Sequence, residues 1–175
     1  MIGVIILNTK DTVELVIKEA REKGIKNIVV ASTTGDTLSY FKGYDDLHIV
    51  GVSNVYDHGT NAFNEQKRKE FKDLGIDIVT AGHALSGAER CFSRRYGGYG
   101  PIEIVADTLR MFGQGTKVCV EVSTMALDAG KIPYNEPVIA VAGNGSGANT
   151  ALILTPSYTN AILNTKIHQF ICKPE

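Results

Sequence analysis

Short runs of β-branched residues alternate with stretches of helical periodicity along the first half of the chain. Residues 28–31 form an uninterrupted apolar run, which is typical of a strand covered on both faces, and residues 47–52 and 76–80 also read as strands. Before the first run, apolar residues recur at the spacing of one helix face: Val13, Val16, Ile17 and Ala20. Further helices are expected at residues 38–42 and 65–74. This alternation predicts a parallel sheet with helices on both faces.

The second half of the chain is less regular. A helix is expected over residues 101–112, and strands are expected over residues 138–142, 151–154 and, as an edge strand, 166–172. Residues 117–129 are ambiguous, because every second residue from 118 to 122 is a valine, as in a strand. The length of this segment and the glycine that ends it favour a mostly buried helix.

Length and charge limit the architecture and the partners. At 175 residues the chain fits one domain, residues 1–175, with no internal repeat or low-complexity linker. Its 18 basic and 19 acidic side chains give a net charge of −1. Without a broad electrostatic attraction, neither nucleic acid nor a membrane is an expected partner.

The cysteines and the first residues predict a cellular location. Cys91, Cys119 and Cys172 are odd in number and far apart, and no metal-ligand spacing is present. We therefore expect no disulfide framework, no metal site and three buried thiols in a reducing environment. The apolar run at residues 2–7 is too short for a signal-peptide core or a membrane span. Together these features predict a cytoplasmic protein.

The first candidate binding loop follows the strand at residues 28–31. It contains four hydroxyl side chains, a glycine and an acidic residue: Ser32, Thr33, Thr34, Gly35, Asp36 and Thr37. If a helix starts here, its free N–H groups and positive dipole end attract phosphate. The carboxyl ends of strands are also where ligands bind in open α/β sheets. The alternative is a hydroxyl-rich helix cap without a ligand.

The second candidate is the glycine-rich loop Gly143, Asn144, Gly145, Ser146 and Gly147. A dinucleotide fingerprint requires a helix after the glycines, but residues 150–155 have the character of a strand. The dinucleotide interpretation is therefore excluded by context. A glycine-rich hairpin still lets a phosphorylated or flat ligand approach the backbone. The alternative is a plain tight turn.

The third candidate loop, residues 80–87, contains His83, Ser86 and Gly87. Together with the nearby Glu89 and Cys91, it resembles the parts of a nucleophile and base, although a hydrogen-bonded loop histidine is the alternative. Downstream residues could add anion contacts or stack on a ring: Arg90, Arg94, Arg95, Tyr96 and Tyr99.

Five segments carry a resemblance to known proteins. They are GIKNIVVASTTG at residues 24–35, HALSG at 83–87, EIVADTLRMFGQG at 103–115, KVCVE at 117–121 and VIAVAG at 138–143. Together they resemble an archaeal and bacterial family of uncharacterised proteins, which is similar to the C-terminal, effector-binding domain of pyruvate kinase. The resemblance covers nearly the whole chain.

This resemblance implies a fold and a ligand. The fold is an α/β, three-layer α/β/α sandwich around a five-stranded, mostly parallel mixed sheet with one antiparallel strand, and residues 117–129 are then helical. In pyruvate kinases, a loop like residues 32–37 holds a phosphate of a sugar bisphosphate, and a loop in the position of residues 143–149 closes over it. Members of the stand-alone family hold flavin mononucleotide (FMN) in this region. The resemblance does not extend to the catalytic barrel, so kinase activity is not implied.

We therefore expect a protein that binds a phosphorylated small ligand, preferably FMN. Its expected site combines the three loops: Ser32, Thr33, Thr34, Gly35, Asp36, Thr37, His83, Ser86, Gly87, Gly143, Asn144, Gly145, Ser146, Gly147 and Asn149. Ser146 departs from the family, because relatives tend to carry a basic residue there, and losing a guanidinium removes a bidentate anion contact.

Two other functions remain open. The chain could be an enzyme, either a flavin-dependent oxidoreductase or a phosphate-ester hydrolase, with His83 or Asp36 as the essential residue. It could also be a regulatory or assembly domain that forms a homo-oligomer, in which the apolar residues 118–129 are an interface instead of core.

Overall fold

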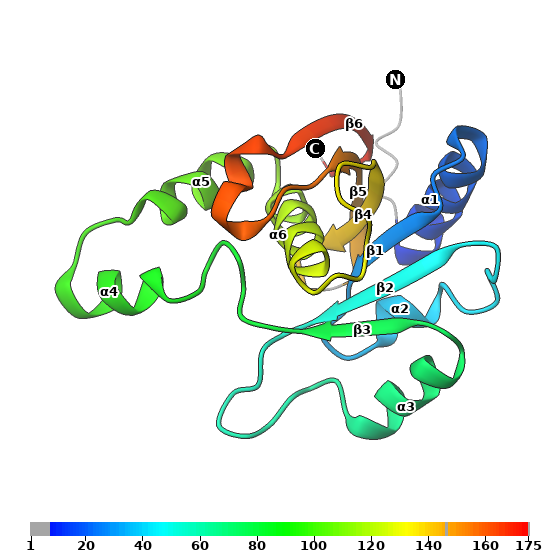
Figure 1. The fold of residues 1–175 in the computed structure, drawn as a ribbon, viewed down its shortest axis with the longest axis horizontal. Helices are drawn as coiled ribbons and strands as arrows, with labels where there is room; N and C mark the ends of the chain where they lie inside the picture. Colours follow the sequence, from blue (N-terminus) through cyan, green and yellow to red (C-terminus); the bar gives the residue numbers. More distant parts are fainter. Residues whose placement is uncertain (1–7, 146, 175) are drawn as a thin grey trace.

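A six-stranded sheet lies at the centre of the computed structural model, which describes residues 8–145 and 147–174. The order of its strands is β3-β2-β1-β4-β5-β6 (Figure 1). The strands are β1 (Asn27–Ala31), β2 (His48–Ser53), β3 (Asp77–Thr80), β4 (Val138–Gly143), β5 (Ala148–Thr155) and β6 (Lys166–Cys172). The helices are α1 (Thr9–Lys23), α2 (Asp36–Ser39), α3 (Glu65–Asp73), α4 (Glu89–Tyr96), α5 (Pro101–Arg110), α6 (Gln114–Asp128) and the 3₁₀ helix η1 (Thr159–Asn164).

Within this sheet, one strand runs against the others. Strands β1 to β4 are parallel, whereas β5 is antiparallel to both of its neighbours, β4 and β6. The predicted mixed sheet with one antiparallel strand is therefore confirmed. The number of strands is six instead of five, because the edge strand expected at residues 166–172 adds β6 to the five that the resemblance implied.

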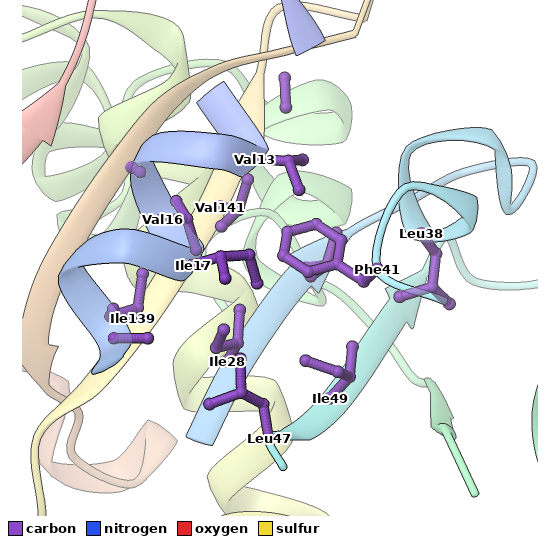
Figure 2. Packing of buried hydrophobic residues seen from close by; sticks show 14 of the residues in the cluster. Val13, Val16, Ile17, Ile28, Leu38, Phe41, Leu47, Ile49, Ile139 and Val141 are labelled. Carbon is purple, nitrogen blue, oxygen red and sulfur yellow. The ribbon is translucent and has the colours of Figure 1, made fainter. Parts of the chain in front are cut away.

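Helices cover both faces of the sheet, and each face has its own apolar core. On one face, α1, α2 and α3 contribute buried residues to the first core. Figure 2 shows Val16 and Ile17 of α1 beside Ile28, Ile139 and Val141 of the sheet. On the other face, α5, α6 and η1 pack on the same strands. This arrangement confirms the three-layer α/β/α sandwich.

The ambiguous segment is helix α6, and it is the most deeply buried helix described. Twelve of its 15 residues are buried. Because almost every position contacts protein, the alternation of valines carries no information about which side faces solvent. The suggestion that residues 118–129 form an interface between subunits is wrong, because this surface packs inside the chain. Self-association itself stays a prediction.

Helix α4 differs from the others because none of its residues is buried. In Figure 1 it lies far from the sheet, at the end of a long connection. Cys91 lies on this helix and is exposed, so the expectation of three buried thiols is wrong for this residue, although Cys119 and Cys172 are buried. All three cysteines are free thiols.

The first helix is capped at both ends, and the second helix is shorter than expected. Asn8 caps α1 by accepting a hydrogen bond from the Asp11 N–H, and Gly24 ends it in the left-handed conformation with a φ of 69°. Helix α2 spans four residues, Asp36–Ser39, where a helix over 38–42 was expected. In the part of the chain that the structure describes, no helix is long and apolar enough to cross a membrane.

The contact between α6 and β5 gives a stability prediction. A Cβ atom at Gly115 would overlap the Thr150 side chain, so Gly115→Ala forces the helix away from the strand. Overpacking typically costs about 1–3 kcal/mol, and alanine regains up to about 1 kcal/mol through helix propensity. We expect the free energy of unfolding to fall by about 1–2 kcal/mol in urea titrations. Gly82→Ala, at a site with open space, is the control, and equal effects of the two changes would contradict the close approach.

Candidate functional site

A cavity of about 900 Å³ opens at the carboxyl ends of the parallel strands. Its walls come from the segments that follow β1, β2, β3 and β4, together with one side of α6. The lining includes eleven of the fifteen expected site residues: Ser32, Thr33, Thr34, Asp36, Thr37, His83, Ser86, Gly143, Asn144, Gly145 and Gly147. Three loops that are distant in the sequence therefore meet at one place, as expected for this edge of an α/β sheet.

The loop after β1 presents hydroxyl groups to this cavity. The Ser32 hydroxyl is buried and accepts a hydrogen bond from the Leu38 N–H at 3.3 Å, which holds the loop in place. Thr33 and Thr37 line the cavity, and neither hydroxyl has a hydrogen-bond partner among the described residues. Gly35, with a φ of 88°, packs against Phe63 and is not among the residues that line the cavity.

Asp36 places a negative charge at the edge of the cavity. It accepts hydrogen bonds of 2.7 Å from both Lys67 Nζ and the Thr34 hydroxyl. The bond from Lys67, followed by that from Thr34, lowers the pKa of the Asp36 carboxyl. Asp36 therefore stays ionised and is balanced by Lys67. Helix α2, which begins here, has a single turn, so its dipole is small. Hydrogen bonds from the hydroxyl and N–H groups of the loop would therefore contribute more to anion binding than the helix dipole.

The glycine-rich loop forms the tight connection between β4 and β5. A Cβ atom at Gly143 would overlap the backbone of Gly147, so the loop requires glycine where its two ends cross. The Ala148 N–H donates to the Thr9 hydroxyl at 3.1 Å, which ties the loop to the start of α1. Asn149 turns its carboxamide to the Thr150 hydroxyl and does not line the cavity. Ser146 lies outside the described residues.

The loop after β3 brings His83 and Ser86 to the cavity, whereas Gly87 does not line it. The Ser86 hydroxyl is directed at the carboxylate of Glu121, 3.4 Å away, and not at the imidazole of His83. A serine nucleophile activated by this histidine is therefore not formed. The chain then continues into α4, where Cys91 is exposed to solvent.

A buried ion pair on α6 was missed by the site prediction. Lys117 and Glu121 are 4% and 2% exposed, and Nζ lies 2.5 Å from Glu121 Oε2. Both residues line the cavity. His83 Nδ1 lies 3.5 Å from the same oxygen, and the other carboxylate oxygen accepts the Leu85 N–H at 3.0 Å. Glu121 thus joins α6 to the loop after β3.

The surroundings of Glu121 fix its charge. Burial alone would raise the pKa of this carboxyl, but the contacts with His83 and Lys117 outweigh burial and lower the pKa from 4.5 to about 2. Glu121 is therefore ionised at neutral pH. Its charge holds Lys117 in place, and Lys117 has no other hydrogen-bond acceptor in the described part of the chain.

Two arginines add positive charge to the cavity. Arg90 and Arg110 both line it, and both also line a second cavity of about 440 Å³ between α4 and α5. Arg110 is held by Gln114 and Asp107. The Arg90 Nε atom is shielded from solvent and has no hydrogen-bond partner among the described residues.

The aromatic residues are distributed differently from the expectation. Tyr99 and Arg94 line the second cavity, whereas Tyr96 and Arg95 line neither. Tyr40, which follows α2, lies at the main cavity instead. Within residues 8–145 and 147–174, no group of three or more potential ligand side chains could hold a metal ion.

The spacing of Lys117 and Glu121 could have revealed the pair. Opposite charges four residues apart lie on the same side of a helix, and in an otherwise apolar segment such a pair is buried together. The site prediction used only the three loops, so this spacing was overlooked even though a mostly buried helix was favoured for residues 117–129.

The ion pair gives a prediction for stability. Removing one partner leaves a buried charge uncompensated, so Lys117→Met and Glu121→Leu should each lower the free energy of unfolding by about 3–5 kcal/mol. The double variant removes both charges and should be more stable than either single variant. A double-mutant cycle from urea unfolding measures this coupling. Additive losses would show that the two charges do not depend on each other.

The low pKa of Glu121 gives a second prediction. Because folding lowers this pKa from 4.5 to about 2, its contribution is complete above pH 4.5 and is lost as the pH falls toward 2. A shift of this size corresponds to about 3 kcal/mol. Urea unfolding between pH 2 and 6 should show a shallower pH dependence for the double variant Lys117→Met/Glu121→Leu than for the wild type. The same slope in both proteins would contradict the assignment.

Comparison with known proteins places this geometry in a family. The family described as "Pyruvate kinase, alpha/beta domain" matches residues 10–154. A solved pyruvate kinase from Cryptosporidium parvum aligns with a TM-score of 0.44 and 11% identity over 86% of this chain and 24% of that enzyme. The enzyme from the same organism in complex with ADP gives 0.43 and 13% over 87% and 24%.

The chain spans about a quarter of the length of these two enzymes. The family match is the more extensive finding, since it runs from the first helix to the fifth strand and includes all of the described loops at the cavity. The chain belongs to the pyruvate kinase α/β-domain family.

Proposed function

We propose that this protein binds a phosphorylated small molecule in the cavity at the carboxyl end of the sheet, with FMN as the preferred ligand. The observation that carries the proposal is the convergence of a hydroxyl loop, a glycine-rich turn and three cationic side chains on one cavity. A volume of about 900 Å³ is within the range of small-molecule sites and is sufficient for a mononucleotide.

The phosphate group has suitable partners on two sides of the cavity. The hydroxyls of Thr33 and Thr37 are free of protein partners in the described structure and can donate to phosphate oxygens. On the other side, Lys117 has one acceptor for its three N–H donors. Arg90 also lines the cavity, and guanidinium groups bind phosphate in a bidentate manner.

The remainder of an FMN molecule has both polar and apolar surfaces to contact. Val52, Val118 and Val122 contribute apolar surface, and the ring of Tyr40 can stack on a flat heterocycle. Gly143, Gly145 and Gly147 line the cavity and have no side chains, so a ligand can approach the backbone closely at these positions. The kinase activity of the related enzymes is not part of this proposal, since the match covers one part of their length.

The state of the purified protein tests the proposal directly. An absorption spectrum of the protein as isolated, followed by mass analysis of whatever it releases on denaturation, should reveal a phosphorylated compound. If the protein is colourless and neither FMN nor a sugar phosphate raises its melting temperature, the proposal is wrong, because a bound ligand must stabilise the folded state.

The contribution of the phosphate can be measured with two flavins. FMN should bind at least tenfold more tightly than riboflavin, which lacks the phosphate, in titrations of flavin fluorescence. Thr33→Val should weaken FMN binding about 10- to 100-fold, because a hydrogen bond to a charged group contributes about 1.5–3 kcal/mol, and should leave riboflavin binding unchanged.

Thr108→Val is a matched control, since Thr108 is exposed on α5 and does not line the cavity. It should not alter the affinity for either flavin. Equal affinities of the wild type for FMN and riboflavin would show that the loop after β1 does not bind phosphate.

A further inference from the structure

We propose that His83 is a general acid–base residue, oriented by Glu121, which transfers protons on a phosphorylated hydroxy-carbonyl compound and so isomerises it. The inference rests on the proposed function, because the same cavity must hold the phosphate of this substrate. It adds an activity and a substrate class to what would otherwise be a binding protein.

The position of the imidazole is the first argument. His83 lines the cavity and its side chain is 29% exposed, so it is accessible to a ligand but supported by protein. Its Nδ1 faces Glu121 Oε2 at 3.5 Å, and Nε2 has no partner in the described structure. A carboxylate beside Nδ1 favours the tautomer with the proton on that nitrogen, which leaves the lone pair on Nε2 for a substrate.

The rigidity of Glu121 is the second argument. Its two oxygens contact the Leu85 N–H, the Ser86 hydroxyl, Lys117 and His83, and its side chain is nearly inaccessible to solvent. A carboxylate fixed in this way keeps the imidazole in one orientation. Glu121 contacts His83 and forms a neutral pair with Lys117, and Arg90 of α4, Arg110 of α5 and Asp36 of α2 line the same cavity.

The proton transfer balances without a further reactant. His83 Nε2 takes the proton from a carbon next to the substrate carbonyl, the C–H electron pair forms the C=C bond of an enediolate, and the carbonyl π electrons move to oxygen. The imidazolium then returns the proton to the former carbonyl carbon. A hydroxyl proton moves between the two substrate oxygens, which completes an aldose–ketose interconversion.

Lys117 has the position and charge to assist this step. Both Lys117 and His83 contact the same oxygen of Glu121, so the two side chains are neighbours at the wall of the cavity. For this substrate the fixed ammonium group stabilises the oxyanion of an enediolate as it forms, and the phosphate is left to Thr33, Thr37 and Arg90. The hydroxyl-rich loop after β1 suits a substrate that carries several hydroxyls as well as a phosphate.

Hydrogen–deuterium exchange tests the activity. Dihydroxyacetone phosphate and ribulose 5-phosphate would be incubated with the protein in D₂O, and the loss of their α-proton signals followed by proton NMR. We expect exchange with the wild type and a rate at least about 100-fold lower with His83→Gln, since general acid–base catalysis contributes about 10²–10⁴-fold. His168→Gln, which changes a histidine on the edge strand β6, should exchange at the wild-type rate.

Binding is measured in parallel, so that a failure can be assigned. The affinity of both sugar phosphates for the wild type and His83→Gln should agree within about threefold, because the phosphate contacts are made elsewhere. With His83→Ala, free imidazole should restore part of the exchange, which a purely structural loss would not allow. Melting temperatures report whether the variants are folded.

The outcomes separate the two proposals. Binding of the sugar phosphates without α-proton exchange overturns the assignment of His83, and so does exchange that His83→Gln retains. Binding of FMN but of neither sugar phosphate also overturns the isomerase activity, and it leaves the proposed function intact. If no phosphorylated compound binds, both proposals are wrong.

Discussion

The buried pair Lys117–Glu121 is the interaction on which the centre of the molecule depends. Each charge has given up its water, so each requires the other, and α6 must stay helical to keep them one turn apart. Glu121 also accepts the Leu85 N–H from the loop after β3. A single carboxylate therefore links the buried helix, the sheet and the cavity. Because the pair is shielded from water, separating its charges is costly. For the same reason, the electrostatic interaction of these charges with a bound ligand is stronger than it would be in water.

The sheet brings this ion pair and three loops to the same cavity. Strands β1 to β4 end at the same edge, and the antiparallel return of β5 keeps the glycine-rich turn at that edge as well. Hydroxyls from one loop, backbone from another and cations from α6 and the α4–α5 region are thereby directed at one volume. None of these segments forms the site alone, which explains why each loop has a structural interpretation when it is taken by itself.

Local periodicity predicted the alternation of helices and strands in the first half of the chain. It could do so because helices such as α1 have one buried apolar face and one face exposed to solvent. Periodicity alone left α6 ambiguous, because a helix surrounded by protein has no solvent-facing side. The length of the segment and the glycine that ends it favoured the helix that is observed. The three loops of the candidate site were identified from composition and their place after strands. Lys117 and Glu121 were not, since they lie inside a helix and not in a loop after a strand. Cys91 was misjudged because sequence does not show that α4 projects from the body.

The hairpin between β4 and β5 has a consequence for how such proteins can diversify. Its tip borders the cavity, while its two ends are held by ladder hydrogen bonds and by the tie from Ala148 to Thr9. Lengthening a loop between anchored strands adds little entropic penalty, about 0.6 kcal/mol for each doubling. Insertions at this turn can therefore reshape the entrance for larger or smaller molecules while both cores remain as they are.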